Sequence, residues 1–259
     1  MVDPVPAAPI NPLRARWAAG EPTFGAIVTM PSPQVIQVLA GAGLDWVIID
    51  MEHGPIDLGT AHSMILATGG TPTIPFVRIA ATVPWLAKPL LDCGALGIAF
   101  PRTNTPDDAA RAVHAVRYPP VGGREWGPFF APLRWGQTPE AYMATANANV
   151  MALITIEHPD AVADIDAICG TPGIDLACIG PGDLSMSMGH PGNPGHPAVL
   201  AAMAEAERGI VASGVPIAGV ARTPEAARQM IDRGYQGLLL GFDWSIMTGA
   251  VRGYLEALR

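Results

Sequence analysis

Short apolar runs rich in β-branched residues alternate with longer amphipathic stretches from about residue 24 to the end of the chain. The amphipathic stretches include 32–43, 105–118, 223–234 and 245–258. Several of them open with Ser or Thr followed by Pro and close with Gly, as helices do. This alternation predicts βα units around a parallel sheet. The eight candidate strands are 24–30, 46–52, 74–79, 96–101, 151–157, 176–180, 216–221 and 237–241.

Eight consecutive βα units favour closure of the sheet into a (β/α)8 or TIM barrel, an α/β fold that often reaches 259 residues as one domain. We therefore expect a single domain over 1–259, with residues 1–20 forming a coil and short helix packed on the barrel. A doubly wound open sheet is the structural alternative. That fold favours a Gly-rich segment after its first strand, where this chain has TMPSP at 29–33.

The composition of the chain indicates what kind of protein it is and which kinds of partner it binds. Hydrophobic residues make up 49% of the chain and charged residues 15%, which indicates a sizeable buried core. The net charge of −8, without a Lys/Arg cluster, argues against nucleic acid or an anionic membrane as partner and favours small molecules. The chain lacks a signal-peptide pattern and a long apolar span, so we expect a cytoplasmic protein. Three cysteines without C-x-x-C spacing fit reduced thiols.

The basic residues exclude two kinds of chemistry. They comprise 14 arginines and a single lysine, Lys88, which lies in an apolar helical run away from any strand end. Imine-forming enzymes and P-loop proteins both need a lysine in the site. A Schiff-base mechanism is therefore not expected.

Two Pro/Gly-rich segments interrupt the alternation, at 119–137 and 181–197. We expect both to be long loops. Barrel enzymes build their sites from the loops that follow the carboxyl ends of strands.

Two carboxylates close apolar strands at positions where barrel sites form. Glu157 ends the run LITIE, and Asp183 lies in the turn GPGD that follows the sixth strand. Such a pair can supply oxygen ligands to a hard divalent cation and leave positions open for water and substrate. The alternative for each residue taken singly is a helix N-cap at a βα junction.

The second and third strands also end in polar residues. Arg78 ends IPFVRI, where its guanidinium can contact a carboxylate or a developing enolate oxygen, or pair with Asp50 on the neighbouring strand. His53 follows Asp50 and Glu52, a position from which an imidazole can transfer protons near neutral pH. A lone histidine is more often structural, so its neighbours make it a candidate.

Six segments carry a resemblance to a known family. They are AGAGLDWVIIDMEHGP, FVRI, LLDCGALGIAFP, RYPPVGGREWG, LITIEHPDAVADIDAI and PGIDLACIGPGDLSMSMGHPGNPGHP. In this order they cover most of residues 24–200, and they resemble the HpcH/HpaI family of class II pyruvate aldolases. The resemblance implies a barrel of the phosphoenolpyruvate/pyruvate-binding type. It implies a divalent cation (Mg²⁺, Mn²⁺ or Co²⁺) bound by Glu157 and Asp183.

The same resemblance assigns roles to further residues. Arg78 would contact the bound 2-oxo acid, and His53 would serve the base with Asp50 as a polar neighbour. The backbone amides of Gly182 and Asp183 would hold the substrate carboxylate.

Asp92, in LLDCG, is linked to the histidine in the family. It precedes the fourth strand, however, so it belongs near the amino-terminal end of its own barrel. Asp92 is therefore either a structural helix-end residue or reaches His53 of a neighbouring subunit. We expect the second arrangement, a homo-oligomer (trimer or hexamer) with shared active sites.

Departures from the family pattern bear on substrate choice. Thr155 stands where the family often has Gln, Gly182 replaces an alanine, and the usual RG-x-G reads Arg124-Glu125-Trp126-Gly127. We expect all three to lie near the pocket, with Thr155 bordering the substrate and Trp126 offering an apolar ring to the aldehyde.

The expected activity is reversible cleavage of a 4-hydroxy-2-oxo acid to pyruvate, or hydroxypyruvate, and an aldehyde. His53 would deprotonate the C4 hydroxyl, directly or through a metal-bound water, while the cation and Arg78 would stabilise charge on the keto oxygen. One alternative is a related metal-enolate lyase, either decarboxylating or acting on a CoA ester. The scarcity of basic residues disfavours CoA. The other alternative is a non-catalytic metabolite-binding barrel, against which the joint presence of Glu157, Asp183, Arg78 and His53 argues.

Overall fold

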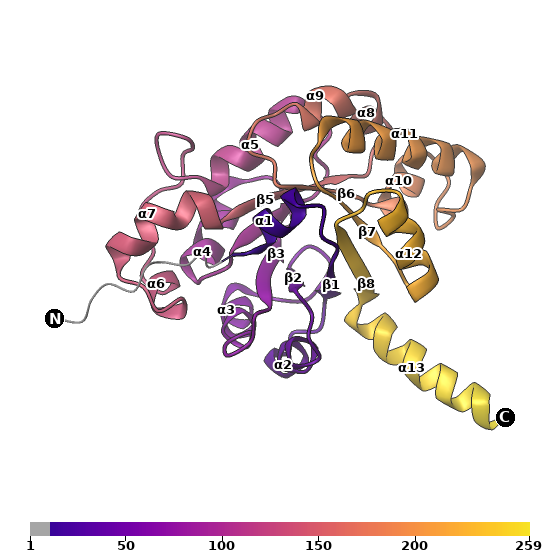
Figure 1. Cartoon of the computed structure of the whole chain (residues 1–259), viewed down its shortest axis with the longest axis horizontal. Coiled ribbons are helices and arrows are strands. Elements are labelled where there is room, and N and C mark those ends of the chain that lie inside the picture. Colours follow the sequence, from indigo (N-terminus) through magenta and orange to yellow (C-terminus); the bar gives the residue numbers. More distant parts are fainter. Residues whose placement is uncertain (1–10) are drawn as a thin grey trace.

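The computed structural model describes residues 11–259, whose eight strands form a closed parallel barrel in sequence order (Figure 1). The predicted fold class is confirmed, and each strand lies within two residues of its predicted bounds. The strands are β1 (Thr23–Val28), β2 (Trp46–Asp50), β3 (Ile74–Arg78), β4 (Gly97–Phe100), β5 (Met151–Ile156), β6 (Leu176–Ile179), β7 (Ile217–Val220) and β8 (Gly237–Phe242).

Helices pack around the barrel and bury the outer face of the strands. Ser32, Thr105 and Thr223 cap three of them, each followed by a proline in the first turn, as the sequence predicts. The helices that follow successive strands are α2 (Pro33–Gly41), α3 (Leu58–Leu66), α4 (Pro84–Asp92), α5 (Pro106–Val116), α8 (Pro159–Ala163) with α9 (Ile165–Cys169), α11 (Pro197–Ser213), α12 (Pro224–Asp232) and α13 (Asp243–Leu258).

Four further helices lie outside this regular pattern. They are α1 (Leu13–Ala18), α6 (Ala131–Arg134), α7 (Pro139–Asn149) and α10 (Pro181–Ser187). The short helix expected within 1–20 is thus present as α1, while residues 1–10 lie outside the described part. Within residues 11–259, no helix is long and apolar enough to span a membrane.

The two expected long loops need correction. The segment 181–197 begins with helix α10 because Pro181 fits the first helical turn and Leu184 is buried. The segment 119–137 contains α6 and connects helix α5 to α7 and then β5. A connection from a helix to the next strand lies where strands begin, so this segment lies at the amino-terminal end of the barrel rather than at the carboxyl end.

Aromatic rings close the amino-terminal end of the barrel. Trp17 of α1 packs edge-on against Trp46 at a centroid distance of 6.2 Å, and Phe76 lies 5.9 Å from Trp46. The indole N–H groups of both tryptophans donate to Thr23 Oγ1. A Cβ on Gly25 would lie 2.5 Å from the Trp46 ring, so this close packing requires glycine. The open end of the barrel is therefore the carboxyl end.

Candidate active site

Arg78 and Asp50 form a buried ion pair at the carboxyl ends of β3 and β2. The two residues are register partners, and the guanidinium donates two hydrogen bonds to the carboxylate, at 2.9 and 2.7 Å. Asp50 is fully buried, and its Oδ1 also accepts the backbone amides of Glu52 (3.1 Å) and His53 (3.4 Å). The predicted pair is confirmed, and Asp50 fixes both the guanidinium and the turn that carries the histidine.

Glu52 lies between the arginine and the histidine. Its Oε2 is 3.2 Å from Arg78 Nε and 3.7 Å from His53 Nε2. Burial raises the pKa of Glu52, although the positive charge of Arg78 opposes the rise. Oε2 is buried and makes no well-aligned hydrogen bond among the described residues, so its contacts with Arg78 and His53 are electrostatic. The His53 side chain, in contrast, is 57% exposed.

Glu157 directly follows β5 and is held in place by a backbone amide. Its Oε1 accepts a hydrogen bond from the Arg102 amide at 2.6 Å, and Arg102 adopts a left-handed backbone with φ of 49° that few non-glycine residues take. Burial raises the pKa of Glu157 to about 7, and the negative charges of Asp183 and Glu52 add to this rise.

Asp183 faces the same cavity from the first turn of α10. The Ser187 hydroxyl donates to the backbone carbonyl of Glu157 at 3.1 Å, which attaches this helix to the end of β5. Gly180 directly precedes α10 and lies beside Glu157. A Cβ there would be 3.0 Å from Glu157 Oε2, so glycine preserves the space beside this oxygen.

The two carboxylates fit a hard divalent cation. Both supply oxygen ligands to one cavity, and the space beside Glu157 Oε2 is preserved by glycine. In the described range 11–259, no cluster of three or more His, Cys, Asp or Glu side chains has a metal-binding arrangement.

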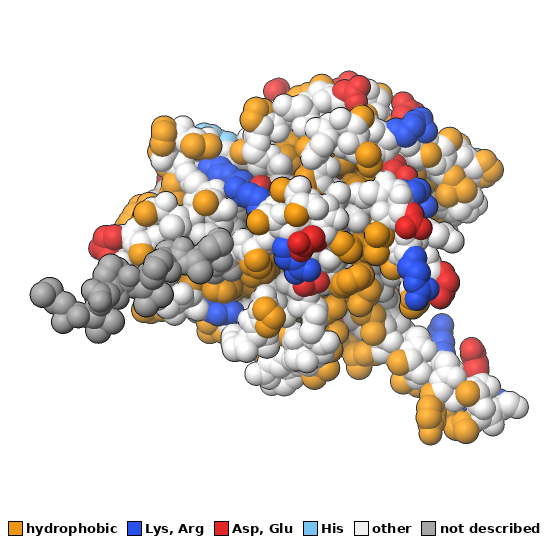
Figure 2. Space-filling view, viewed as in Figure 1, with side chains coloured by type: hydrophobic (Ala, Val, Ile, Leu, Met, Phe, Trp, Pro, Cys, Tyr) orange, Lys and Arg blue, Asp and Glu red, His pale blue; other side chains and the backbone are white. Residues whose placement is uncertain are grey.

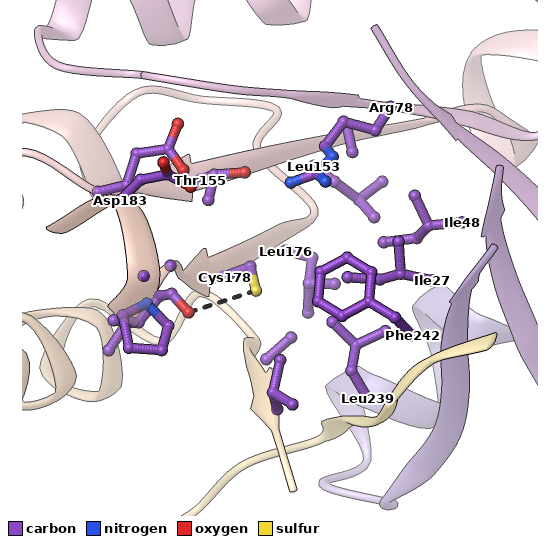
Figure 3. Close-up of a pocket in the computed structure, with 18 of the residues that line it drawn as sticks. Ile27, Ile48, Arg78, Leu153, Thr155, Leu176, Cys178, Asp183, Leu239 and Phe242 are labelled. Carbon is purple, nitrogen blue, oxygen red and sulfur yellow. Dashed lines mark hydrogen bonds between the residues drawn. The ribbon is translucent and has the colours of Figure 1, made fainter. Parts of the chain in front are cut away.

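The cavity extends from the carboxyl end of the barrel into its interior and has a volume of about 490 Å³. Thr155 and Gly182 line it, as predicted, and Trp46 lies at its floor. Figure 3 shows Asp183 and Thr155 on one side, Arg78 reaching in, and apolar side chains on the other side, those of Ile27, Ile48, Leu239 and Phe242.

Arg222, just past β7, also lines this cavity. Within residues 11–259, no carboxylate forms an ion pair with it, whereas the neighbouring Arg228 pairs with Glu225. The sequence analysis missed Arg222, although a charged residue that ends an apolar strand is the same signal that identified Arg78.

Asp92 and Trp126 do not join the cavity of their own chain. Asp92 ends α4 at the amino-terminal end of the barrel and binds Arg124 at 2.7 Å. A Cβ on Gly127 would lie 3.0 Å from Asp92 Oδ2, so the whole 124–127 segment lies beside this aspartate. The expectation that 124–127 lies near its own pocket is wrong, because that segment connects a helix to a strand.

Lys88 also lies away from the cavity. It belongs to α4, where its amine binds Glu125 at 2.5 Å, and it does not line the cavity. This position gives the amine no access to a substrate held by Glu157 and Asp183.

Comparison with known proteins identifies the family. The HpcH/HpaI aldolase/citrate lyase family model matches residues 24–250. A hydroxypyruvate/pyruvate aldolase of Cupriavidus necator is 37% identical over 250 residues, 96% of this chain and 93% of the relative. An Escherichia coli 4-hydroxy-2-oxo-heptane-1,7-dioate aldolase is 34% identical, with 93% and 92% covered. The solved structure of an HpcH/HpaI aldolase/citrate lyase family protein from Burkholderia cenocepacia superposes with a TM-score of 0.88 at 36% identity, covering 96% of this chain and 99% of the other. The chain belongs to the HpcH/HpaI aldolase/citrate lyase family.

Proposed function

We propose that the protein is a class II aldolase that cleaves a 4-hydroxy-2-oxo acid reversibly to pyruvate or hydroxypyruvate and an aldehyde. The observation that carries this proposal is the placement of Glu157, Asp183 and Arg78 around one cavity at the carboxyl end of the barrel. The similar proteins from Cupriavidus necator and Escherichia coli are named as aldolases of such substrates.

Glu157 and Asp183 would hold the divalent cation, which is Mg²⁺, Mn²⁺ or Co²⁺ in this proposal. When bound, the cation supplies positive charge that stabilises the negative charge developing on the keto oxygen. The first-turn amides of Gly182 and Asp183 are in position to bind the substrate carboxylate, and Thr155 borders the same space.

Arg78 supplies a second positive group. Its Nε and Nη2 bind Asp50, so Nη1 remains to donate to the keto oxygen. Because Asp50 and the strand register fix the guanidinium, it needs little reorganisation as charge develops.

His53 is the proposed base. In the cleavage direction it takes the proton of the C4 hydroxyl, the C3–C4 bond breaks, and its electron pair moves to the 2-oxo acid fragment. The hydroxyl-bearing carbon leaves as the aldehyde, and protonation at C3 completes the donor product. Glu52, 3.7 Å from His53 Nε2, would stabilise the protonated imidazole.

We further propose that sites are shared in a homo-oligomer, a trimer or hexamer, in which Asp92 of one copy contacts His53 of another. Two observations support this. His53 is open to solvent at one end of the barrel, whereas Asp92 lies at the other end. The segment beside Asp92 exposes Trp126, Phe129 and Phe130, an apolar surface that association would bury. Trp126 would then contribute its ring to the aldehyde pocket of the neighbouring copy.

The direct test is a cleavage assay on several 4-hydroxy-2-oxo acids, with detection of pyruvate and hydroxypyruvate and with oxaloacetate decarboxylation as a comparison. We expect EDTA to abolish cleavage and added Mg²⁺, Mn²⁺ or Co²⁺ to restore it. Glu157→Gln should abolish it as well, whereas Glu140→Gln, on the exposed first turn of α7, should not. Cleavage that survives both EDTA and Glu157→Gln, or borohydride trapping of substrate on Lys88, would contradict the proposal.

A further inference from the structure

Arg124 is buried at the amino-terminal end of the barrel, where its guanidinium binds Asp92. The arginine side chain has no exposed surface, whereas that of Asp92 keeps 16%. The guanidinium carbon lies 4.3 Å from the centroid of the Tyr118 ring, and Nη1 donates to the Tyr142 hydroxyl at 3.3 Å. Nη2 donates to Asp92 Oδ1 at 2.7 Å. Two tyrosines therefore hold the guanidinium, and the guanidinium fixes one oxygen of the carboxylate.

The pair between Asp92 and Arg124 is poorly suited to a purely structural role. Arg124 Nε is buried without a hydrogen-bond partner among residues 11–259, and an unsatisfied buried donor costs stability. Asp92 is the last residue of α4, where its negative charge lies at the negative end of the helix dipole. These two costs indicate that the carboxylate serves a purpose other than stabilising its own chain.

A second buried Arg–Asp pair at the same end of the barrel provides a comparison. Asp175 precedes β6, and its Oδ1 and Oδ2 bind Arg14 at 2.8 Å and Arg117 at 2.6 Å. The backbone amide of Ala152 also donates to Oδ2 at 2.8 Å. Both oxygens of that aspartate are therefore bound. Asp92, in contrast, uses only Oδ1, and within the described part of the chain no donor binds its Oδ2.

Gly127 keeps this free oxygen accessible. A Cβ at this position would lie 3.0 Å from Asp92 Oδ2, so a larger residue would cover the oxygen. The nearby Trp126 and Phe129 are exposed. Figure 2, in which α1 and the amino-terminal side of the barrel face the viewer, shows exposed hydrophobic side chains with charged ones scattered among them. The free oxygen therefore lies beside a surface that a second copy of the chain can cover.

We propose that Arg124 is a positioning residue for the shared active site: it fixes Asp92 so that Oδ2, kept open by Gly127, binds the imidazole of His53 in a neighbouring copy. This inference rests on the proposed contact between Asp92 and His53 and adds the group that orients it. An aspartate fixes the tautomer and the orientation of an imidazole only when its own rotamer is held. Misplacement by about 1 Å in such an arrangement costs up to about a hundredfold in rate.

The first test is the kinetics of two Arg124 variants. Arg124→Met places an apolar side chain of similar length between the tyrosines and should lower kcat by up to about a hundredfold. KM for the 2-oxo acid should stay nearly unchanged, since Glu157, Asp183 and Arg78 hold the donor. Arg124→Lys should retain more activity than Arg124→Met, because an ammonium group can still donate to Asp92.

Two matched controls separate positioning from stability. Arg117→Met breaks the other buried pair, so it should lower the melting temperature but leave kcat per folded chain unchanged. Gly127→Ala leaves the ion pair intact and covers Oδ2, so it should lower kcat. Gly41→Ala, where a Cβ meets nothing within 4 Å, should not. Equal losses of kcat in Arg117→Met and Arg124→Met would assign Arg124 a structural role.

Mixed oligomers show in which chain Arg124 acts. The proposal requires Arg124 in the copy that contributes Asp92. Co-expressed Arg124→Met and His53→Ala chains should therefore regain activity, because some sites combine a wild-type His53 with an intact pair of Asp92 and Arg124. Co-expressed Arg124→Met and Asp92→Asn chains should not regain activity, because neither chain supplies a correctly held aspartate.

The outcomes distinguish this inference from the proposed contact on which it rests. Full activity of Asp92→Asn would remove that contact, and the inference with it. An inactive Asp92→Asn beside a fully active Arg124→Met would overturn the inference alone. Recovery on mixing Arg124→Met with Asp92→Asn would also overturn it, because Arg124 would then act on the cavity of its own chain. If Arg124→Met does not fold, Tyr142→Phe removes one guanidinium contact with little change in shape, and an unchanged kcat in both Tyr142→Phe and Gly127→Ala would overturn the proposal.

Discussion

Arg78 shows how a strand-end residue obtains a fixed geometry. A guanidinium buried between β2 and β3 costs desolvation, and the two hydrogen bonds to Asp50 offset that cost. We expect Asp50→Asn to destabilise the protein by about 3–5 kcal/mol, because it removes the buried carboxylate that accepts two hydrogen bonds from Arg78 and leaves only the contact with Glu52. Urea unfolding measures this change.

The control for that prediction is an exposed pair. Glu225→Gln breaks the contact with Arg228, in which both side chains are well exposed, and should change the stability by at most about 1 kcal/mol. Equal effects of the two substitutions would contradict the view that burial makes the Asp50 pair important.

Glu157 predicts a pH dependence of cation binding. Its pKa in the folded protein without metal is raised from 4.5 to about 7 by burial, so the folded form keeps a proton that the unfolded chain has lost. The stability that this proton contributes is present below pH 4.5 and is lost as the pH rises to about 7. A bound cation requires the deprotonated carboxylate, so its affinity should increase in that same range.

Thermal shifts measure this effect without an assay of activity. The stabilisation by Mn²⁺ should be small at pH about 6 and larger at pH about 8, because below the pKa the cation must displace a proton. Glu157→Gln should remove the stabilisation at both pH values. A shift that is equal at both pH values in the unmodified protein would show that Glu157 does not ligate the cation.

The position of Arg222 in the cavity leads to a prediction about how the aldehyde half of the substrate is recognised. Arg78 is paired with Asp50 and Glu52, and the two carboxylates that line the cavity, Glu157 and Asp183, are assigned to the cation. Arg222 is the cavity cation left without a counter-ion among residues 11–259, so it is suited to an anionic group at the far end of the aldehyde.

We expect Arg222→Gln to raise KM for a carboxylated aldehyde by about tenfold or more, the effect of losing one charged hydrogen bond, and to leave KM for a neutral aldehyde nearly unchanged. Condensation rates with pyruvate and each aldehyde measure this. Arg228→Gln, in α12 and outside the cavity, is the control. An equal rise for both aldehydes would assign Arg222 a structural role.

At the scale of elements, the junction between β6 and α10 positions the carboxylates. Gly180→Ala would place a methyl group 3.0 Å from Glu157 Oε2 and 3.2 Å from the Thr155 side chain. We expect this variant to lose most of its cation affinity while it remains folded, since the methyl group occupies the space beside the ligand oxygen. Calorimetric titration with Mn²⁺ measures the loss.

Gly182→Ala is the matched substitution two residues later, where a Cβ meets nothing within 4 Å. It should leave folding and cation affinity unchanged and reduce the use of hydroxypyruvate more than that of pyruvate, because the added methyl group borders the donor. A loss of cation affinity equal to that of Gly180→Ala would contradict the role given to Gly180.

For the whole molecule, the proposed shared site gives a complementation test. His53→Ala and Asp92→Asn chains should each be inactive, because each lacks one member of the dyad. Mixed oligomers contain some sites in which both residues are wild type, so activity should partly return. If mixed particles form, as seen by mass, and no activity returns, Asp92 has only the structural contact with Arg124.

The sequence by itself determined the barrel fold and several of the residues at the carboxyl ends of its strands. Strand positions follow from apolar runs of β-branched residues, and helix starts follow from Ser/Thr-Pro caps, because both signals are local. Glu157, Asp183 and Arg78 were predicted to meet because the carboxyl ends of parallel strands lie on one side of a barrel, and the structure places all three around one cavity.

Only the tertiary structure decided the features that depend on distant contacts. Helix α10 within 181–197 depends on burial of Leu184, and the role of the Arg102 amide depends on the approach of β4 to β5. The 119–137 segment resembles an active-site loop in composition, but its place is set by topology. The direction of α13 is likewise set by the hydrogen bonds that Asp243 accepts from Thr29 and Met30, which follow β1 and lie more than 200 positions earlier in the chain. No local pattern in the sequence encodes these contacts.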